Sequence, residues 1–265
     1  MYATLACLLD RLDRKCLITN DVIPWGAPVP SFGDATISHV ATLGLNPSNR
    51  EFVDEKGKEL QGHLRRFHTL NSLGIDHWLD AEASHLELII ESCQEYFYRN
   101  PYEGWFRKLD RVLSGTGFSY FDAKAPACHL DLIPYATGRK WSALSSHQRT
   151  ALLKNASDTL ALLLRDSSIK AIVLNGISVV ENFQLSMGIV LDRKRMANWT
   201  LPRRDSNGVA GFAYRGVLSE LVGVQSPRPV LVLGYNHNLQ SSFGVTTRVM
   251  GAIRDWIATE VGALA

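Results

Sequence analysis

Residues 37–48 have the sequence ISHVATLGLNPS, in which an apolar run ends abruptly in an amide, a proline and a hydroxyl. Short apolar runs rich in β-branched residues are typical of strands covered on both faces of a sheet. Three more follow: PACHLDLIPY (126–135), KAIVLNG (170–176) and PVLVLGY (229–235). Longer segments of helical period separate these runs. The alternation predicts a three-layer α/β/α sandwich around a central, four-stranded, mostly parallel sheet.

The segments between the strands predict helices by the spacing of their apolar residues. Residues 86–97 and 102–113 show helical spacing between the first two strands. Ser145 and Gln148 form a capping box ahead of one further helix, whose apolar stripe extends to Leu163. After the fourth strand, apolar residues on one face of 245–257 predict the last helix.

Residues 188–225 depart from this alternation and predict a small hairpin insertion around Ser206, Asn207 and Gly208. Basic residues outnumber acidic ones in this insertion, which contains the consecutive residues Arg193, Lys194 and Arg195. A basic segment of this kind is typical either of a nucleic-acid contact or of an ordinary solvated surface.

Composition bounds the class of protein. The chain has 265 residues and a formal net charge of +2, so we expect a single domain over 1–265 whose basic surface is local. Residues 1–36 are expected to form an N-terminal helix and a lead-in loop. The four cysteines lie far apart, which favours free thiols and no metal site. Without a signal peptide or a membrane-spanning run, we expect a soluble, cytoplasmic monomer.

The ends of the four apolar runs resemble, in order, the motifs of the uracil-DNA glycosylase superfamily. GLNPS (44–48) is similar to the first motif, in the branches that use asparagine there. HLDLIPYAT (129–137) and IVLNGISVVENF (172–183) resemble the middle and third strand ends. GYNHNLQSS (234–242) resembles the motif in which a histidine closes the last strand. Across about 37–257, the resemblance implies a DNA partner, base flipping, no cofactor and an abasic product.

The resemblance implies catalytic roles for Asn46 and His237. An asparagine amide can hold a water by donor and acceptor together, but it is not a strong base. A histidine can donate a hydrogen bond to the pyrimidine oxygen where negative charge develops. The alternative roles are a turn cap for Asn46 and a surface loop for His237. No lysine occurs in the motifs to form a Schiff base, which favours monofunctional hydrolysis.

Two departures from the uracil-specific members bear on the base. Asp131 stands where the base-reading asparagine is expected, and an ionised carboxylate accepts from the exocyclic amine of cytosine but repels O4 of uracil. Ser48 stands where a tyrosine excludes C5 substituents, so it leaves room there. Together they predict a C5-modified cytosine, such as the hydroxymethylated or glucosylated base of phage DNA, and an antiviral role. Asp131 is otherwise a strand-end carboxylate in an ion pair.

Further residues are assigned to the DNA by their position in the motifs. Phe52 is the candidate for stacking on the flipped base, although a phenylalanine is more often a core residue. The loop after the last strand is predicted to contact the backbone and to fill the gap left by the base. Its candidates are Asn238, Leu239, Gln240, Ser241 and Ser242. Arg193, Lys194 and Arg195 are predicted to contact phosphates.

Three other functions are compatible with the sequence. A uracil or mismatch-repair glycosylase would use the same motifs with a different base. A hydrolase would use Ser178, Asp192 and His237, but Val180 occupies the position where the nucleophile turn needs a second glycine. A non-catalytic nucleic-acid-binding module would keep the basic hairpin and give Asn46 no chemical role.

Overall fold

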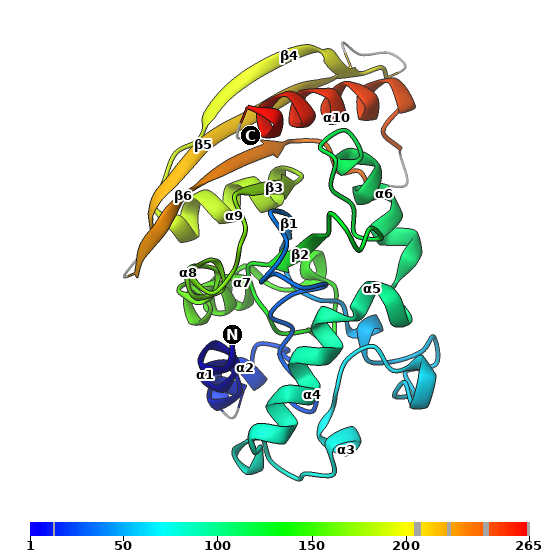
Figure 1. Ribbon diagram of the computed structural model, residues 1–265, viewed down its shortest axis with the longest axis vertical. Coiled ribbons are helices and arrows are strands. Elements are labelled where there is room, and N and C mark those ends of the chain that lie inside the picture. The colour runs from blue at the N-terminus through cyan, green and yellow to red at the C-terminus, as the bar shows by residue number, and fades with distance from the viewer. Residues whose placement is uncertain (13, 204–207, 222–223, 241–243, 264–265) are drawn as a thin grey trace.

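The computed structural model describes residues 1–12, 14–203, 208–221, 224–240 and 244–263. Six strands in this part of the chain form a single sheet in the order β2-β1-β3-β6-β5-β4 (Figure 1). They are β1 (Val40–Gly44), β2 (Ala127–Asp131), β3 (Ala171–Asn175), β4 (Asp192–Leu201), β5 (Val209–Leu221) and β6 (Val224–Tyr235). The four predicted strands are β1, β2, β3 and β6, and β1 is parallel to β2 and β3, as β3 is to β6.

The sheet is wider than predicted, because the hairpin at 188–225 is not a separate insertion. Its strands, β4 and β5, are antiparallel to each other, and β5 pairs along β6 from Val224 to Tyr235. A strand at the edge of a parallel sheet has unpaired N–H and C=O groups, and β5 satisfies those of β6. Ser206 and Asn207, at the predicted turn, lie outside the described residues.

Helices cover both faces of the sheet. They are α1 (Tyr2–Leu12), α2 (Lys15–Ile18), α3 (Leu70–Leu73), α4 (Ala83–Gln94), α5 (Tyr96–Arg99), α6 (Glu103–Leu113), α7 (Ser146–Asn155), α8 (Thr159–Arg165), α9 (Ile177–Met187) and α10 (Thr247–Gly262), with the 3-10 turns η1 (Asn49–Glu51), η2 (Gly62–Leu64), η3 (Trp78–Asp80) and η4 (Trp141–Ala143). The apolar sides of α6 and α10 pack on one face, and those of α8 and α9 on the other (Figure 1). Every residue of β1 and β2 is therefore buried.

The capping box at Ser145 and Gln148 is confirmed, since each side chain accepts from the backbone N–H of the other residue. The single helix predicted after it is wrong, because α7 and α8 are separate. Arg11 of α1 lies at the break, where its guanidinium donates to the Asn155 carbonyl and pairs with Asp158. Those bonds satisfy groups that the break frees from helical pairing.

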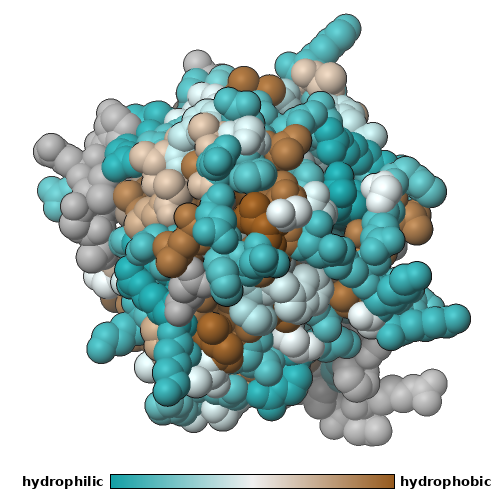
Figure 2. All heavy atoms as spheres, turned by 90° about the horizontal axis from the view of Figure 1, so that it is seen from below, coloured by the Kyte–Doolittle hydropathy of each residue, from teal (hydrophilic) through white to brown (hydrophobic). Residues whose placement is uncertain are grey.

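A third apolar cluster lies under α1, where side chains of α4 and α7 meet the residues that follow β2. Hydrophilic residues, with small apolar areas between them, cover the face seen from below in Figure 2. No helix within the described ranges is long and apolar enough to cross a membrane. The four cysteines are free thiols, as predicted.

Candidate functional site

The carboxyl ends of β1, β2, β3 and β6 share one edge of the sheet, because these strands are parallel. Asn46 follows β1, Asp131 and Asn175 end β2 and β3, and Asn236 follows β6. The ends of β1 and β6 are separated by β3 alone, so they lie two strand spacings apart, roughly 10 Å. Asn175, at the end of β3, lies between them.

The amide of Asn46 is held by its surroundings. Nδ2 donates to the carbonyl of Pro47 at 3.0 Å and to Oγ1 of Thr137 at 2.9 Å, and Thr137 donates in turn to the carbonyl of Arg139. Both amide hydrogens are used, and no described residue donates to Oδ1. Asn46 therefore offers an acceptor for a water, rather than the donor and acceptor together that the sequence predicts.

Asp131 lies buried beside β1, with 3% of its surface exposed. Oδ1 is 3.4 Å from Nε2 of His129. Its neighbour across the ladder is Gly44, and a Cβ at that position would clash with the carboxylate of Asp131. The glycine of the first motif thus makes room for the side chain that ends the next strand.

Glu51 is a second buried carboxyl group at this corner, which was not predicted from the sequence. The Tyr96 hydroxyl donates to Oε2 at 2.9 Å, and Nε of Arg66 lies 3.8 Å away. Burial raises the pKa of Glu51 to about 7, against the opposite effects of Arg66 and Tyr96, and the charge of Asp131 adds to the rise. No sequence signal marks Glu51, because an acid in a polar loop is normally exposed.

Ser48 and Phe52 occupy different environments on the same loop. Ser48 is exposed and caps η1 by accepting from the N–H of Arg50. Phe52 is 1% exposed and lies among core aromatic rings, with the centroids of Trp25 at 6.0 Å and Phe67 at 5.9 Å. Ser48 is open to a substituent from outside, whereas the ring of Phe52 has no free face in this structure.

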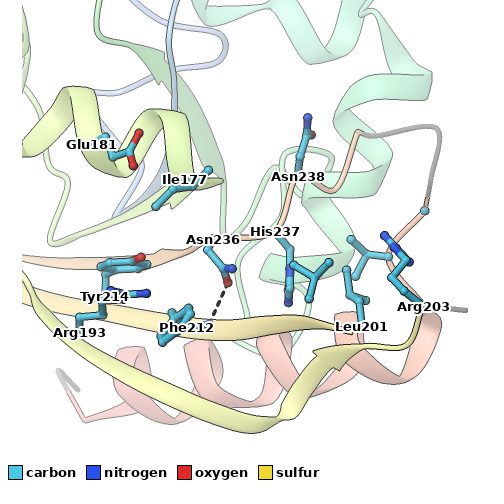
Figure 3. A pocket seen from close by; sticks show the side chains of 13 residues that line it. Ile177, Glu181, Arg193, Leu201, Arg203, Phe212, Tyr214, Asn236, His237 and Asn238 are labelled. Atoms are coloured by element: carbon cyan, nitrogen blue, oxygen red, sulfur yellow. Dashed lines mark hydrogen bonds between the residues drawn. The ribbon is translucent and has the colours of Figure 1, made fainter. Parts of the chain in front are cut away.

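His237 does not present its N–H to the sheet edge. Nε2 lies 2.6 Å from the carbonyl of Trp199 in β4 and donates to it, so the side chain points toward the hairpin (Figure 3). Burial lowers the pKa of His237, the bond to Trp199 opposes this, and Arg203 reinforces it. A neutral ring whose one N–H is engaged can only accept at Nδ1. The predicted donation to a pyrimidine oxygen is not available in this geometry.

Asn236 and His237 together fasten the last motif to the hairpin. Oδ1 of Asn236 accepts from the N–H of Phe212 at 2.8 Å (Figure 3). Nδ2 donates to the carbonyl of Ala210, also at 2.8 Å. The amide thereby extends the pairing of β5 beyond the end of β6. These side-chain bonds hold the hairpin at the carboxyl edge of the sheet.

The loop after β6 differs from its predicted role. Asn238 is exposed and accepts from the N–H of Gln240, whose own Nε2 donates to the carbonyl of Trp105. Leu239 is 2% exposed and packs in the core, so it offers no wedge to a base stack in this structure. Ser241 and Ser242 lie outside the described residues.

A pocket of about 450 Å³ lies beside His237, between α9 and the hairpin (Figure 3). Arg193 lines it with its guanidinium 3.7 Å from the ring centroid of Phe212, and Arg203 lies at its rim. Residues alternate between the faces of a strand, so Arg195 shares the face of Arg193 while Lys194 lies on the opposite face. The three consecutive basic residues of β4 therefore do not form one basic surface, because their side chains lie on opposite faces of the sheet.

The structure divides the predicted residues into two groups. Asn46 and Asp131 lie at the ends of the neighbouring strands β1 and β2, whereas His237 and Arg193 line the pocket on the α9 side of the hairpin. The hydrolase triad is not assembled: Ser178 is exposed on α9, and the ring N–H of His237 is bound to Trp199. No group of three metal-ligating side chains occurs among the described residues.

No protein-family model matches the chain, and no curated protein sequence matches it.

Proposed function

We propose that this protein is a DNA glycosylase, which flips a pyrimidine out of the duplex and hydrolyses its N-glycosidic bond. The observation that carries the proposal is the set of polar side chains at the carboxyl edge of four parallel strands. Asn46 follows β1, and Asp131 and Asn175 end β2 and β3. Ligands of open α/β sheets bind at this edge. The order of these residues also supports the resemblance to the uracil-DNA glycosylase superfamily.

The chemistry follows from what Asn46 can do. The bond between C1′ of the sugar and the ring nitrogen breaks, its electron pair leaves with the base, and positive charge develops on the sugar. A water that donates to Oδ1 of Asn46 then adds to C1′ and loses its proton to solvent. The amide of Asn46 cannot take a proton from the water, so it does little to activate the attack. Departure of the nucleobase is therefore the difficult step. The product is an abasic site, and this hydrolysis uses no cofactor.

The proposed base is a cytosine with a C5 substituent, for example hydroxymethylcytosine or its glucosylated form in phage DNA. Asp131 supports this choice by its chemistry, because a carboxylate accepts from an exocyclic amine and repels the O4 of uracil. The side chain is 3% exposed in this structure, so binding of the base requires the strand end to open around it. Ser48 supports it because the side chain is small and exposed. An enzyme of this specificity would act against phage genomes as a monomer on DNA.

The test is base release from duplexes that carry normal, uracil and C5-modified cytosine bases, followed by mass spectrometry of the free base. We expect release of modified cytosine. A strong preference for uracil would favour a repair glycosylase instead, and DNA binding without release of any base would favour a binding module.

The residue-level test is Asn46→Ala. This variant removes the water acceptor, so we expect loss of base release by at least about 100-fold with DNA affinity retained. Asn49→Ala is the control, because Asn49 lies in the same loop; its side chain donates to the carbonyl of Gly138 and accepts from the Ser48 hydroxyl at 3.5 Å. Equal release by the two variants would contradict the role of Asn46.

A further inference from the structure

A chain of buried polar side chains leads across the sheet to Asp131. It begins at the hydroxyl of Tyr120, which contacts Oγ1 of Thr42, and Oγ1 lies 2.6 Å from Nδ1 of His129. On the other side of the ring, Nε2 lies 3.4 Å from Oδ1 of Asp131. All four side chains are at most 3% exposed. Core strands normally place aliphatic residues there, so a connected polar chain needs an explanation.

Strand register creates this chain. Thr42 of β1 is the cross-strand partner of His129, and Gly44 is that of Asp131. These four residues share the face that α6 covers, because side chains alternate along a strand. The side chain missing at Gly44 leaves the space in which the carboxylate approaches the imidazole.

The surroundings hold the imidazole of His129 in place. Its ring centroid lies 5.4 Å from that of Phe32, 5.1 Å from that of Trp105 and 5.4 Å from that of Phe106, each ring edge-on. Aromatic packing on these sides fixes the ring plane. The position of Nε2 relative to Asp131 is therefore set by the core.

With a neutral imidazole, one arrangement of the hydrogen atoms suits every member of the chain. Burial raises the pKa of Tyr120 well above its usual value, so its hydroxyl remains a donor and serves Oγ1 of Thr42. Thr42 then donates to Nδ1, which places the imidazole proton on Nε2, facing the carboxylate. With the proton on Nδ1 instead, a nitrogen lone pair would face the carboxylate oxygen.

We propose that His129 is the positioning residue for Asp131 and thereby determines which base is accepted. Its N–H turns toward Oδ1 and restrains the carboxylate, which leaves Oδ2 to accept from the exocyclic amine of the base. Tyr120 and Thr42 set the orientation of His129. The inference rests on the proposed glycosylase function, and it adds a residue that the base does not touch.

The test compares two duplexes, one with 5-hydroxymethylcytosine and one with 5-hydroxymethyluracil. The two bases share the C5 substituent and differ at C4, where one has an amine and the other an oxygen. The quantity measured is the ratio of kcat/KM for the two bases. A residue with only a structural role would lower both values and leave the ratio unchanged.

We expect His129→Leu to lower this ratio about tenfold, which is the effect of losing one polar contact that orients the carboxylate. His129→Gln keeps an amide donor near the position of Nε2, and most of the ratio should return. Thr42→Val keeps the shape of the side chain and removes only the hydroxyl, so it tests the same point if His129→Leu fails to fold. We expect this variant to lower the ratio as well.

An unchanged ratio of kcat/KM in folded His129→Leu, or in Thr42→Val, would overturn this inference and leave the proposed glycosylase function standing. Release of neither base by the wild-type protein would overturn the proposed function and, with it, the inference. A lower ratio in His129→Leu that His129→Gln does not restore would also count against the positioning role.

Discussion

Glu51 is a carboxyl group whose partners do not compensate fully for its burial. Burial raises its pKa from 4.5 to about 7, although Arg66 and Tyr96 act against the rise. Between these values the folded protein binds a proton that the unfolded chain has released, so stability falls as pH rises through this window. Above the window the charged form costs about 3 kcal/mol.

Glu51→Gln should remove this pH dependence. The amide still accepts from Tyr96 and carries no charge, so we expect the variant to be about 3 kcal/mol more stable than wild type near pH 8 and similar near pH 4.5. Urea unfolding at both pH values measures the difference. Glu55→Gln is the control, since the side chain of Glu55 is 93% exposed. Parallel pH profiles for wild type and Glu51→Gln would contradict the prediction.

At the scale of elements, the hairpin of β4 and β5 is held from two sides. The carbonyl of Trp199 accepts from His237, while its indole packs edge-on against Trp256 of α10 at 5.4 Å. The indole nitrogen of Trp199 is buried without a partner among the described residues. In this structure, His237 therefore attaches the end of β6 to β4 of the hairpin, a role that its sequence motif does not predict.

His237→Phe tests whether this hydrogen bond stabilises the hairpin. The variant keeps a buried ring but leaves the carbonyl of Trp199 without its donor, so we expect a loss of about 1–3 kcal/mol in the free energy of unfolding. Denaturant unfolding measures the loss, and His147→Phe on the exposed side of α7 is the control. Unchanged stability with lower base release would instead favour the direct catalytic role that the sequence predicts.

At the scale of the whole molecule, the net charge is small, and the position of the basic residues of β4 matters more than their number. The formal net charge is +2, and Arg193 and Arg195 share one face of the sheet while Lys194 lies on the other. Arg193 pairs with Tyr214 of β5, which pairs in turn with Gly234 near the carboxyl end of β6. The two arginines are thus near the edge at which the proposed substrate binds.

Replacing Arg193 and Arg195 with glutamine should weaken DNA binding and its dependence on salt. Each lost phosphate contact lowers the slope of log K against log salt by about 0.9, so the double variant should lose about 1–2. Lys194→Gln should change it little. Anisotropy of a labelled duplex over a salt series measures the slopes, and equal changes for both variants would contradict the assignment of faces.

The four parallel strands and their polar ends could be predicted because they are local features of the sequence. An apolar run that stops at Asn46 or Asp131 shows a buried strand and a polar tip together. Glu51 could not be found in this way. Its burial depends on Tyr96, 45 residues further along the chain, which no local pattern reports.

By itself, the sequence determined that this is an α/β protein whose buried parallel strands end in Asn46, Asp131 and Asn175, because hydrophobic period and strand ends are encoded locally. Tertiary structure alone decided that the hairpin widens the sheet and that His237 binds Trp199, 38 residues away. It also decided that Thr42 aligns His129 across 87 residues. Such contacts follow from strand register and packing, which bring together residues that the chain keeps far apart.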